Sequence, residues 1–243
     1  MCGIFGIVGD PVTDAIDRAC DAMRHRGPDD RGAYLDDAAG LGMTRLAILD
    51  LSRAGHQPMG TDDGALWIVH NGEVYNFGEE RRRLEAKGLR FRSHTDTEVI
   101  LRLYEELGPA CLGRLRGMFA FAVWDARDRR LFAARDRLGI KPLYYAWNGH
   151  RLVFASELKA LLASGLVQGR LSMEGLALYL TFGYVPSPNT LIEGVHALQA
   201  GHHLTLEKER LTVRRYWDLP TGSARRPLPP RASGRRPSSS APS

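Results

Sequence analysis

The sequence predicts a layered α+β domain whose sheets are largely antiparallel. Segments with strand and helix patterns are both plentiful, and several strand candidates are joined by short turns, as in hairpins. The patterned region contains no internal repeat and ends at one composition boundary, near Leu219. We therefore expect one domain over residues 2–219, followed by a disordered tail rich in Pro, Ser and Arg over residues 220–243.

Strands are predicted wherever a short apolar run is bounded by turn residues. These runs are 4–8, 32–35, 41–49, 66–70, 117–125, 130–134, 143–147 and 151–155, with a last hairpin within 201–217. The clearest hairpin has Asn148 and Gly149 at its turn, because Asn-Gly favours the tight turns that join antiparallel strands.

Helices are predicted where a capping residue precedes an apolar stripe. Thr13 and Asn76 are each expected to cap a helix, and the segment 95–98 has the pattern of a capping box. The helices expected in this way are 13–27, 76–88, 95–108, 156–163 and 172–182.

Charge and hydropathy exclude two classes of partner. The tail holds five of the 33 basic residues and no acid, which leaves 28 basic against 28 acidic residues in the rest, so we expect no nucleic-acid partner. The longest apolar run is 118–124, far shorter than the roughly 20 residues that span a bilayer. The first basic residue is Arg18, so an export signal is not expected either, and the prediction is a cytoplasmic protein without a membrane segment.

The three cysteines predict neither a disulfide framework nor a metal site, because their number is odd and no CxxC spacing occurs. Cys20 and Cys111 have apolar neighbours and are expected to be buried. Cys2 differs, because an initiator methionine before a small residue is normally removed. The new terminus would carry an α-amine, with a pKa of about 8, beside a thiol with a pKa of about 8.5. This is the arrangement of an N-terminal nucleophile with its own base.

An ordered set of segments then points to one family. The segments are MCGIFGIVGD at 1–10, RHRGPDDRG at 24–32, RLAILDLSRAGHQPM at 45–59, HNGEVYNF at 70–77, SHTDTEVIL at 93–101, GMFAFAVWD at 117–125, ARDRLGIKPLYY at 134–145, FASELKALL at 154–162 and YVPSPNTLIEGVHALQAGHHLTL at 184–206. In this order they resemble the glutaminase half of glutamine-hydrolysing asparagine synthetases. The resemblance implies a class II glutamine amidotransferase domain over 2–219. Its expected fold is that of the N-terminal nucleophile hydrolases, a four-layer αββα sandwich with two antiparallel sheets.

The resemblance also assigns catalytic residues. Cys2 is the implied nucleophile, and Asn71 and Gly72 form the implied oxyanion hole, which stabilises the negative charge of the tetrahedral intermediate. A side-chain amide and an unhindered glycine N–H are suitable donors for that task. The alternative for these two residues is an ordinary Asn-Gly turn at the end of a strand.

Substrate recognition is assigned in the same way. Arg45 is implied to bind the α-carboxylate of glutamine, and Asp96 its α-ammonium. We expect Asp96 to stay readily ionised, because it lies in the first turn of a helix. A surface ion pair for Arg45 and a simple helix-start role for Asp96 are the alternatives. The remaining pocket residues implied are Leu46, Ala47, Ile48, Leu49 and Glu73.

The resemblance therefore implies hydrolysis of L-glutamine to glutamate and ammonia for asparagine biosynthesis. The chain has no SGGxDS phosphate loop, so ATP and Mg are expected in a missing synthetase domain and no cofactor is expected here. We expect a truncated or frame-disrupted synthetase, for which a separate synthetase subunit and a second copy of the chain are the candidate protein partners. Two alternatives stay open, namely another N-terminal cysteine amidohydrolase and a non-catalytic remnant or regulatory glutamine-binding module.

Overall fold

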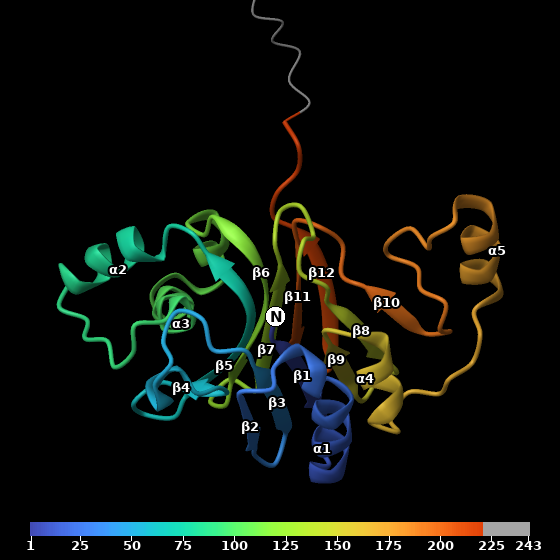
Figure 1. The fold of residues 1–243 in the computed structure, drawn as a ribbon, viewed down its shortest axis with the longest axis horizontal. Coiled ribbons are helices and arrows are strands. Elements are labelled where there is room, and N and C mark those ends of the chain that lie inside the picture. The colour runs from blue at the N-terminus through green and yellow to red at the C-terminus, as the bar shows by residue number, and fades with distance from the viewer. Residues whose placement is uncertain (221–243) are drawn as a thin grey trace, which may run out of the picture.

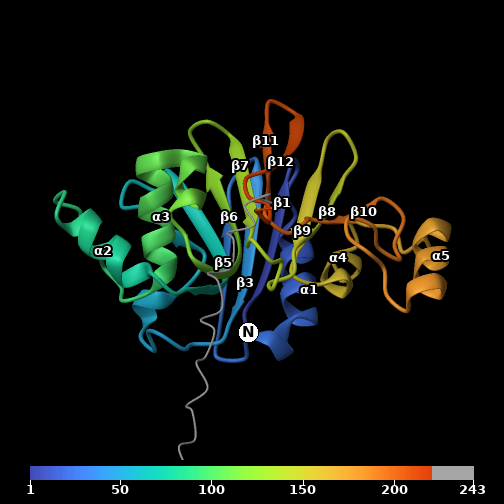
Figure 2. The same cartoon turned by 90° about the horizontal axis from the view of Figure 1, so that it is seen from above.

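The domain is built of four layers. A computed structural model of the chain describes residues 1–220, so the predicted disorder of the tail lies outside the described residues except for residue 220. Two six-stranded antiparallel sheets lie face to face, and helices cover the outer face of each sheet (Figures 1 and 2). The predicted αββα sandwich is confirmed.

The first sheet holds the N-terminus in its middle. Its strand order is β10-β8-β9-β1-β3-β2. The bounds are β1 Gly3–Val8, β2 Asp30–Leu35, β3 Ala39–Arg45, β8 Tyr144–Trp147, β9 Leu152–Ala155 and β10 Val195–Ala197. Gly3 lies opposite Thr44 of β3, and Phe5 lies opposite Ala155 of β9. The strand β1 is therefore paired with β3 from its first residue and with β9 from its third.

The second sheet has the order β12-β11-β7-β6-β5-β4. Its strands are β4 Met59–Gly60, β5 Leu66–Val74, β6 Gly117–Asp125, β7 Arg130–Arg135, β11 His202–Glu207 and β12 Arg210–Arg215. The strands β5 and β6 are paired over the whole length of both, from Leu66 opposite Asp125 to Val74 opposite Gly117.

Four of the five α-helices that the structure describes lie on the sheets, and the fifth stands apart from them. In both views α1 (Thr13–Ala22) and α4 (Leu158–Ala163) lie on the first sheet, whereas α2 (Phe77–Glu85) and α3 (Asp96–Leu107) lie on the second. The helix α5 (Met173–Phe182) stands at the far edge of the molecule (Figures 1 and 2). Within residues 1–220, no helix has the length and apolar composition needed to cross a bilayer.

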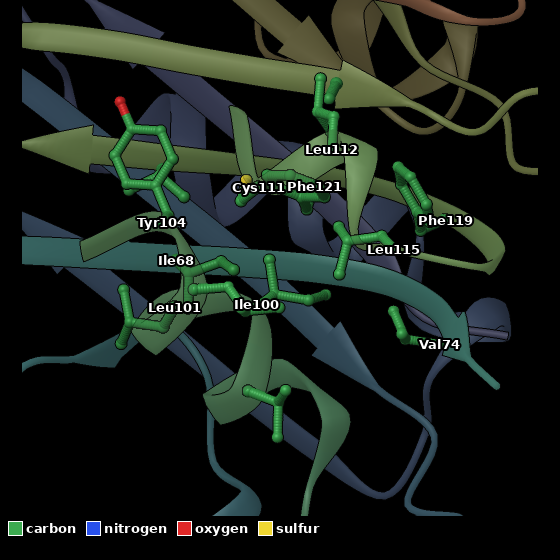
Figure 3. Close-up of a cluster of buried hydrophobic side chains, with 14 of the residues drawn as sticks. Ile68, Val74, Ile100, Leu101, Tyr104, Cys111, Leu112, Leu115, Phe119 and Phe121 are labelled. Atoms are coloured by element: carbon green, nitrogen blue, oxygen red, sulfur yellow. The ribbon is translucent and has the colours of Figure 1, made fainter. Parts of the chain in front are cut away.

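Three apolar cores hold the layers together. Between the sheets, Ile4 and Met43 of the first sheet pack in one cluster with Val69 and Trp124 of the second. Burying each such side chain contributes roughly 1.5–3 kcal/mol. The core between α3 and the second sheet is shown in Figure 3, where the labelled members are Ile68, Val74, Ile100, Leu101, Tyr104, Cys111, Leu112, Leu115, Phe119 and Phe121. Cys20 and Cys111 are fully buried, as predicted.

Two of the three helix starts differ from the prediction. Thr13 does not cap α1, since the cap position is Val12 and no side chain caps it; the helix ends at Ala22 and a 3₁₀ turn, Arg24–Arg26, follows. Asn76 occupies the cap position of α2, but its amide bonds to the backbone of Arg114 and Arg116 instead of its own helix. Of these three, only Thr95 caps its helix, accepting from the N–H of Glu98 at 3.2 Å. The predicted capping box is half formed, because the Glu98 carboxylate accepts from the N–H groups of Arg92 and Ser93 and not from that of Thr95.

Two strand ends also differ, and both lie at the site described below. The strand predicted over 41–49 ends at Arg45, and residues 46–49 form a loop. The strand predicted over 66–70 continues to Val74, because pairing with β6 extends that far. The short strands β4 and β10 were not predicted, since runs of two and three residues show no period.

Candidate functional site

A cavity of about 240 Å³ opens at the N-terminal end of β1. Its walls come from the ends of β3 and β5, the loop after β3 and the first turn of α3. Every site residue predicted from the sequence lines it except Ala47. The two sheets and α3 thus bring together side chains that lie far apart in the sequence.

Cys2 lies just before the first residue of β1 and faces the loop that follows β3. Its Sγ lies 3.5 Å from the N–H of Leu46, which donates to it, and 3.7 Å from the carbonyl oxygen of the same residue. Burial raises the pKa of the Cys2 thiol, while the Leu46 N–H acts in the opposite direction. Met1 precedes Cys2 in this structure and lines the cavity, so the nitrogen of Cys2 is an amide here. The free amine exists only after Met1 is removed.

Asn71 and Gly72 lie within β5, opposite Ala120 and Phe119 of β6. This position rules out the Asn-Gly turn as their role. Asn71 is fully buried, and neither atom of its side-chain amide has a hydrogen-bond partner within residues 1–220. An unpaired buried amide is costly, so both atoms of this one are available to bind a ligand or water in the cavity.

Gly72 is required where it stands. A Cβ on this residue would lie 2.2 Å from the carbonyl oxygen of Met118 and 2.6 Å from Cα of Phe119. Both atoms belong to the backbone of β6, so any side chain would push β5 and β6 apart. The absence of a side chain also leaves the backbone at this point accessible from the cavity.

Arg45 ends β3 and is buried, with 7% of its surface exposed. Its guanidinium donates to the carbonyl oxygen of Ser52 at 3.2 Å and to that of Asp50. These partners are neutral carbonyls, so a surface ion pair does not describe Arg45. A Cβ on Gly55 would lie 2.1 Å from Nη2, so the glycine makes room for the guanidinium.

Asp96 begins α3 and is buried, with 5% of its surface exposed. Oδ2 accepts a hydrogen bond of 2.8 Å from the N–H of Val74. Burial raises the pKa of Asp96 to about 6, although the backbone N–H groups of Val74, Thr97 and Asp96 itself oppose the rise. Loss of solvent thus outweighs the favourable helix start, so ionisation of Asp96 is harder than expected, although the carboxyl is still mostly ionised at neutral pH.

Glu73 is half-buried beside Asp96. Burial and the charge of Asp96 raise the pKa of Glu73, and the positive charge of Lys141 lowers it. The cavity thus brings together a thiol, an unpaired amide, a guanidinium and two carboxylates. It suits a small molecule that carries a carboxylate, an ammonium and an amide.

Comparison with known proteins decides the family. The family model described as "Glutamine amidotransferase domain" matches residues 1–217. The chain belongs to the class II glutamine amidotransferases.

The relatives of this amidotransferase domain are longer proteins. "Putative asparagine synthetase (glutamine-hydrolyzing) 2" of Methanocaldococcus jannaschii is 38% identical, over 90% of this chain and 47% of its own length. "Asparagine synthetase (glutamine-hydrolyzing) 3" of Bacillus subtilis is 39% identical, over 90% of this chain and 37% of its own length. The chain therefore spans less than half of each relative.

A solved structure confirms the fold of the amidotransferase domain. It is the glutamine phosphoribosylpyrophosphate amidotransferase of B. subtilis complexed with ADP and GMP. The two superpose with a TM-score of 0.67 at 21% identity, over 89% of this chain and 49% of the other.

Three polar side chains of the amidotransferase site, those of Gln57, His70 and Thr97, were not predicted from the sequence. Gln57 accepts from the N–H of His70 at 2.7 Å and donates to Oγ1 of Thr97 at 3.1 Å, and Thr97 bonds to Nδ1 of His70 at 3.1 Å. Burial lowers the pKa of His70 to about 3, with a further contribution from Lys141. The imidazole is therefore neutral. The Gln57 amide donates to Thr97, and the Thr97 hydroxyl in turn contacts Nδ1, so these three side chains form one hydrogen-bonded group.

Lys141 is a further residue that the sequence did not reveal. It is almost fully buried and lines the cavity. The fully buried Asp136 holds it there: Oδ2 accepts from the N–H of Lys141 at 2.9 Å and from that of Phe119 at 3.2 Å. The segment ARDRLGIKPLYY, which had no assigned role beyond the resemblance, thus ties a turn to β6 and directs Lys141 to the site.

Ala47 is the one predicted residue that the structure does not bring into the cavity. Its N–H donates to Oδ2 of Asp29 at 2.9 Å, and it lines a neighbouring hollow together with His56. The loop after Arg45 turns toward Asp29 at this point. Ala47 therefore helps to fix the loop and is not a pocket residue in this structure.

Proposed function

We propose that this domain hydrolyses the side-chain amide of L-glutamine to glutamate and ammonia, with Cys2 as the nucleophile. One observation supports this most strongly. The Cys2 thiol shares one cavity with the unpaired amide of Asn71, and the same cavity holds Arg45 and Asp96. Membership of the amidotransferase family agrees with it.

The chemistry follows from these groups. After Met1 is removed, the α-amine of Cys2 takes the proton of the thiol, and the thiolate attacks the amide carbon of glutamine. The amide of Asn71 and the N–H of Gly72 donate to the oxyanion that forms. When the intermediate collapses, the carbon–nitrogen bond breaks and the α-ammonium of Cys2 returns the proton to the leaving nitrogen, which departs as ammonia. Water then attacks the thioester, with the α-amine as base, and glutamate is released.

Recognition of glutamine is proposed to use the charged side chains of the cavity, those of Arg45, Asp96 and Glu73. Arg45 would bind the α-carboxylate, and its several N–H donors allow this in addition to the carbonyl contacts that it already makes. Asp96 and Glu73 would bind the α-ammonium. Leu46, Ile48 and Leu49 line the entrance, with Ile48 and Leu49 largely exposed before the ligand arrives.

The ammonia is proposed to serve asparagine synthesis, as the names of the relatives suggest. The acceptor reaction would take place in a synthetase module, either a further part of the same protein or a separate subunit, and ATP and Mg would bind there. A second copy of the chain is the other proposed protein partner. We also propose a cytoplasmic location.

A glutaminase assay tests this proposal. We expect purified protein whose intact mass begins at Cys2 to release glutamate and ammonia in equal amounts. The variant Cys2→Ser should lose nearly all turnover, because a hydroxyl is far harder to deprotonate. Aspartate and ATP should yield no asparagine with residues 1–243 alone. Glutamine binding by calorimetry without turnover would replace the proposal with a non-catalytic binding module, and full activity in protein that retains Met1 would overturn the mechanism.

A further inference from the structure

We infer that Glu157 is a positioning residue for the nucleophile, acting on Cys2 through the side chain of Arg26. This inference rests on the proposed function of Cys2. Neither Glu157 nor Arg26 lines the cavity, and their effect is on the orientation of a residue that does.

A continuous chain of hydrogen bonds links the two ends. Nε of Arg26 donates to the carbonyl oxygen of Cys2 at 2.8 Å. Nη1 of the same guanidinium donates to Oε1 of Glu157, also at 2.8 Å. Arg26 is buried in the 3₁₀ turn after α1, and its Nη2 has no hydrogen-bond partner in the part of the chain that the structure describes. Glu157 is therefore the group that fixes the far end of the guanidinium.

Cys2 needs such support because the sheet does not hold it. The strand β1 begins at Gly3, whose partner in β3 is Thr44, so the ladder ends one residue short of the nucleophile. Once Met1 is removed, Cys2 is covalently bonded to the chain only through its carbonyl, and within residues 1–220 its thiol makes only the long contacts to Leu46. The contact with Arg26 is at that carbonyl, so it restricts how both the amine and the thiol face Asn71.

The residue before Glu157 supports the same end of the strand. Ser156 accepts from the N–H of Ile4 with its Oγ at 3.1 Å and donates its own N–H to the carbonyl of Ile4 at 2.9 Å. The two residues that follow β9 thus support this part of the chain twice. Ser156 bonds to the backbone of Ile4, and Glu157, through Arg26, acts on the backbone of Cys2.

The main partner of the Glu157 carboxylate is Arg26. It occupies the cap position of α4, yet it makes no cap hydrogen bond to that helix. Its other contacts are with His25 Nε2 at 3.1 Å and Lys159 Nζ at 3.3 Å, and both of these side chains are largely exposed. Exposed pairs of this kind contribute little, so the buried Arg26 is the partner that matters.

The test compares substitutions of equal length. Glu157→Gln retains an oxygen that accepts from Arg26, whereas Glu157→Met does not. We expect Glu157→Met to lower kcat for glutamine by about ten- to a hundredfold, with KM within about threefold of wild type. Glu157→Gln should restore most of kcat. Lys159→Ala, which removes a different partner of Glu157, is the matched control and should behave as wild type.

A second readout does not depend on turnover. In protein labelled with ¹³C-cysteine, NMR signals of Cys2 should move and show greater mobility in Glu157→Met but not in Glu157→Gln. The buried Cys20 and Cys111 are internal controls for the fold and should keep their signals. This measurement stands even if the wild-type protein fails to hydrolyse glutamine, which would refute the proposed function alone.

The inference fails if Glu157→Met leaves both kcat and the Cys2 signals at their wild-type values. It also fails if Glu157→Gln is as impaired as Glu157→Met. Should Glu157→Met disturb the signals of Cys20 and Cys111, Glu157→Asp takes its place, because Asp keeps the charge on a side chain one methylene shorter. Its kcat should then fall between those of wild type and Arg26→Ala, and a kcat equal to wild type would refute the inference.

Discussion

The N–H of Val74, at the end of β5, donates a hydrogen bond of 2.8 Å to Oδ2 of Asp96, the first residue of α3. This bond joins the strand that carries Asn71 and Gly72 to the helix that carries the proposed ammonium-binding carboxylate. The proposed oxyanion-hole residues and the proposed ammonium-binding carboxylate are thereby joined through one hydrogen bond.

Asp96→Asn should weaken glutamine binding and stabilise the empty protein. A carboxylate buried at this position has a pKa of about 6 instead of the ordinary 3.8, so the folded state binds its proton more tightly than the unfolded chain does. Stability therefore falls as pH rises from about 4 to about 6 and stays lower above it. Asn cannot ionise and can still accept from Val74. We expect the variant to be more stable at pH 7.5 by up to roughly 3 kcal/mol, a gain that disappears below about pH 4.

Urea unfolding of both proteins at pH 7.5 and pH 4, without glutamine, measures this difference. KM for glutamine should rise at least about tenfold in the same variant, since a charged partner of the ammonium is lost. A variant that is less stable than wild type at pH 7.5 would contradict the argument.

The pH profile of kcat/KM should show two groups on its acidic side. The amine of Cys2, with an ordinary pKa of about 8, must be unprotonated to act as base. Asp96, with a pKa of about 6, must be ionised to bind the ammonium. We expect log kcat/KM to fall with a slope of about one between pH 8 and 6 and of about two below pH 6. In Asp96→Asn the second bend should be absent; if it persists, another group is responsible for it.

Asn71→Ala should act on the chemical step. Its amide has no partner in the described empty site, and its best partner is the oxyanion of the intermediate. We expect kcat to fall by about a hundredfold or more and KM to change little. Asn148→Ala, in the exposed hairpin turn between β8 and β9, is the control. An effect of Asn71→Ala on KM alone would remove Asn71 from the oxyanion hole.

Gly55→Ala should impair substrate binding without unfolding the protein. The new Cβ would lie 2.1 Å from Nη2 of Arg45, and the end of a flexible side chain moves more readily than backbone does. Arg45 is then displaced from the cavity, and KM for glutamine should rise by about tenfold or more with kcat nearly unchanged. Gly113→Ala places its Cβ in open space and should have no effect. If Gly55→Ala has normal steady-state kinetics, Arg45 does not bind the carboxylate.

The sequence was sufficient for the layers and for the residues that occur in ordered motifs. Prediction from the sequence was wrong where tertiary contacts decide the local secondary structure. Residues 46–49 have the apolar character of a strand, yet they form a loop, because Asp29 accepts the N–H of Ala47. Asn71 and Gly72 have the character of a turn, yet they lie within β5, because β6 pairs with them along its whole length.

Other site residues lie in the segments that carry the resemblance, but nothing in the sequence assigns them to the site. Gln57, His70 and Lys141 come from three separate segments, and only the folded sheet brings their side chains to one wall. The proton affinity of Asp96 depends in the same way on its surroundings, since the helix start is visible in the sequence and the depth of burial is not.

The place of β1 between β9 and β3 has a consequence for synthesis of the protein. Cys2 is the first of the site residues to be synthesised, and the strand β1 that follows it pairs with β9, which ends at Ala155. At 5–20 residues per second, translation needs about 8–30 s to reach that strand. During this interval β1 lacks one of its two neighbouring strands, and the contacts of Ser156 and Glu157 that support Cys2 are absent as well. The nucleophile is thus the first part of the site to exist chemically and among the last to be enclosed.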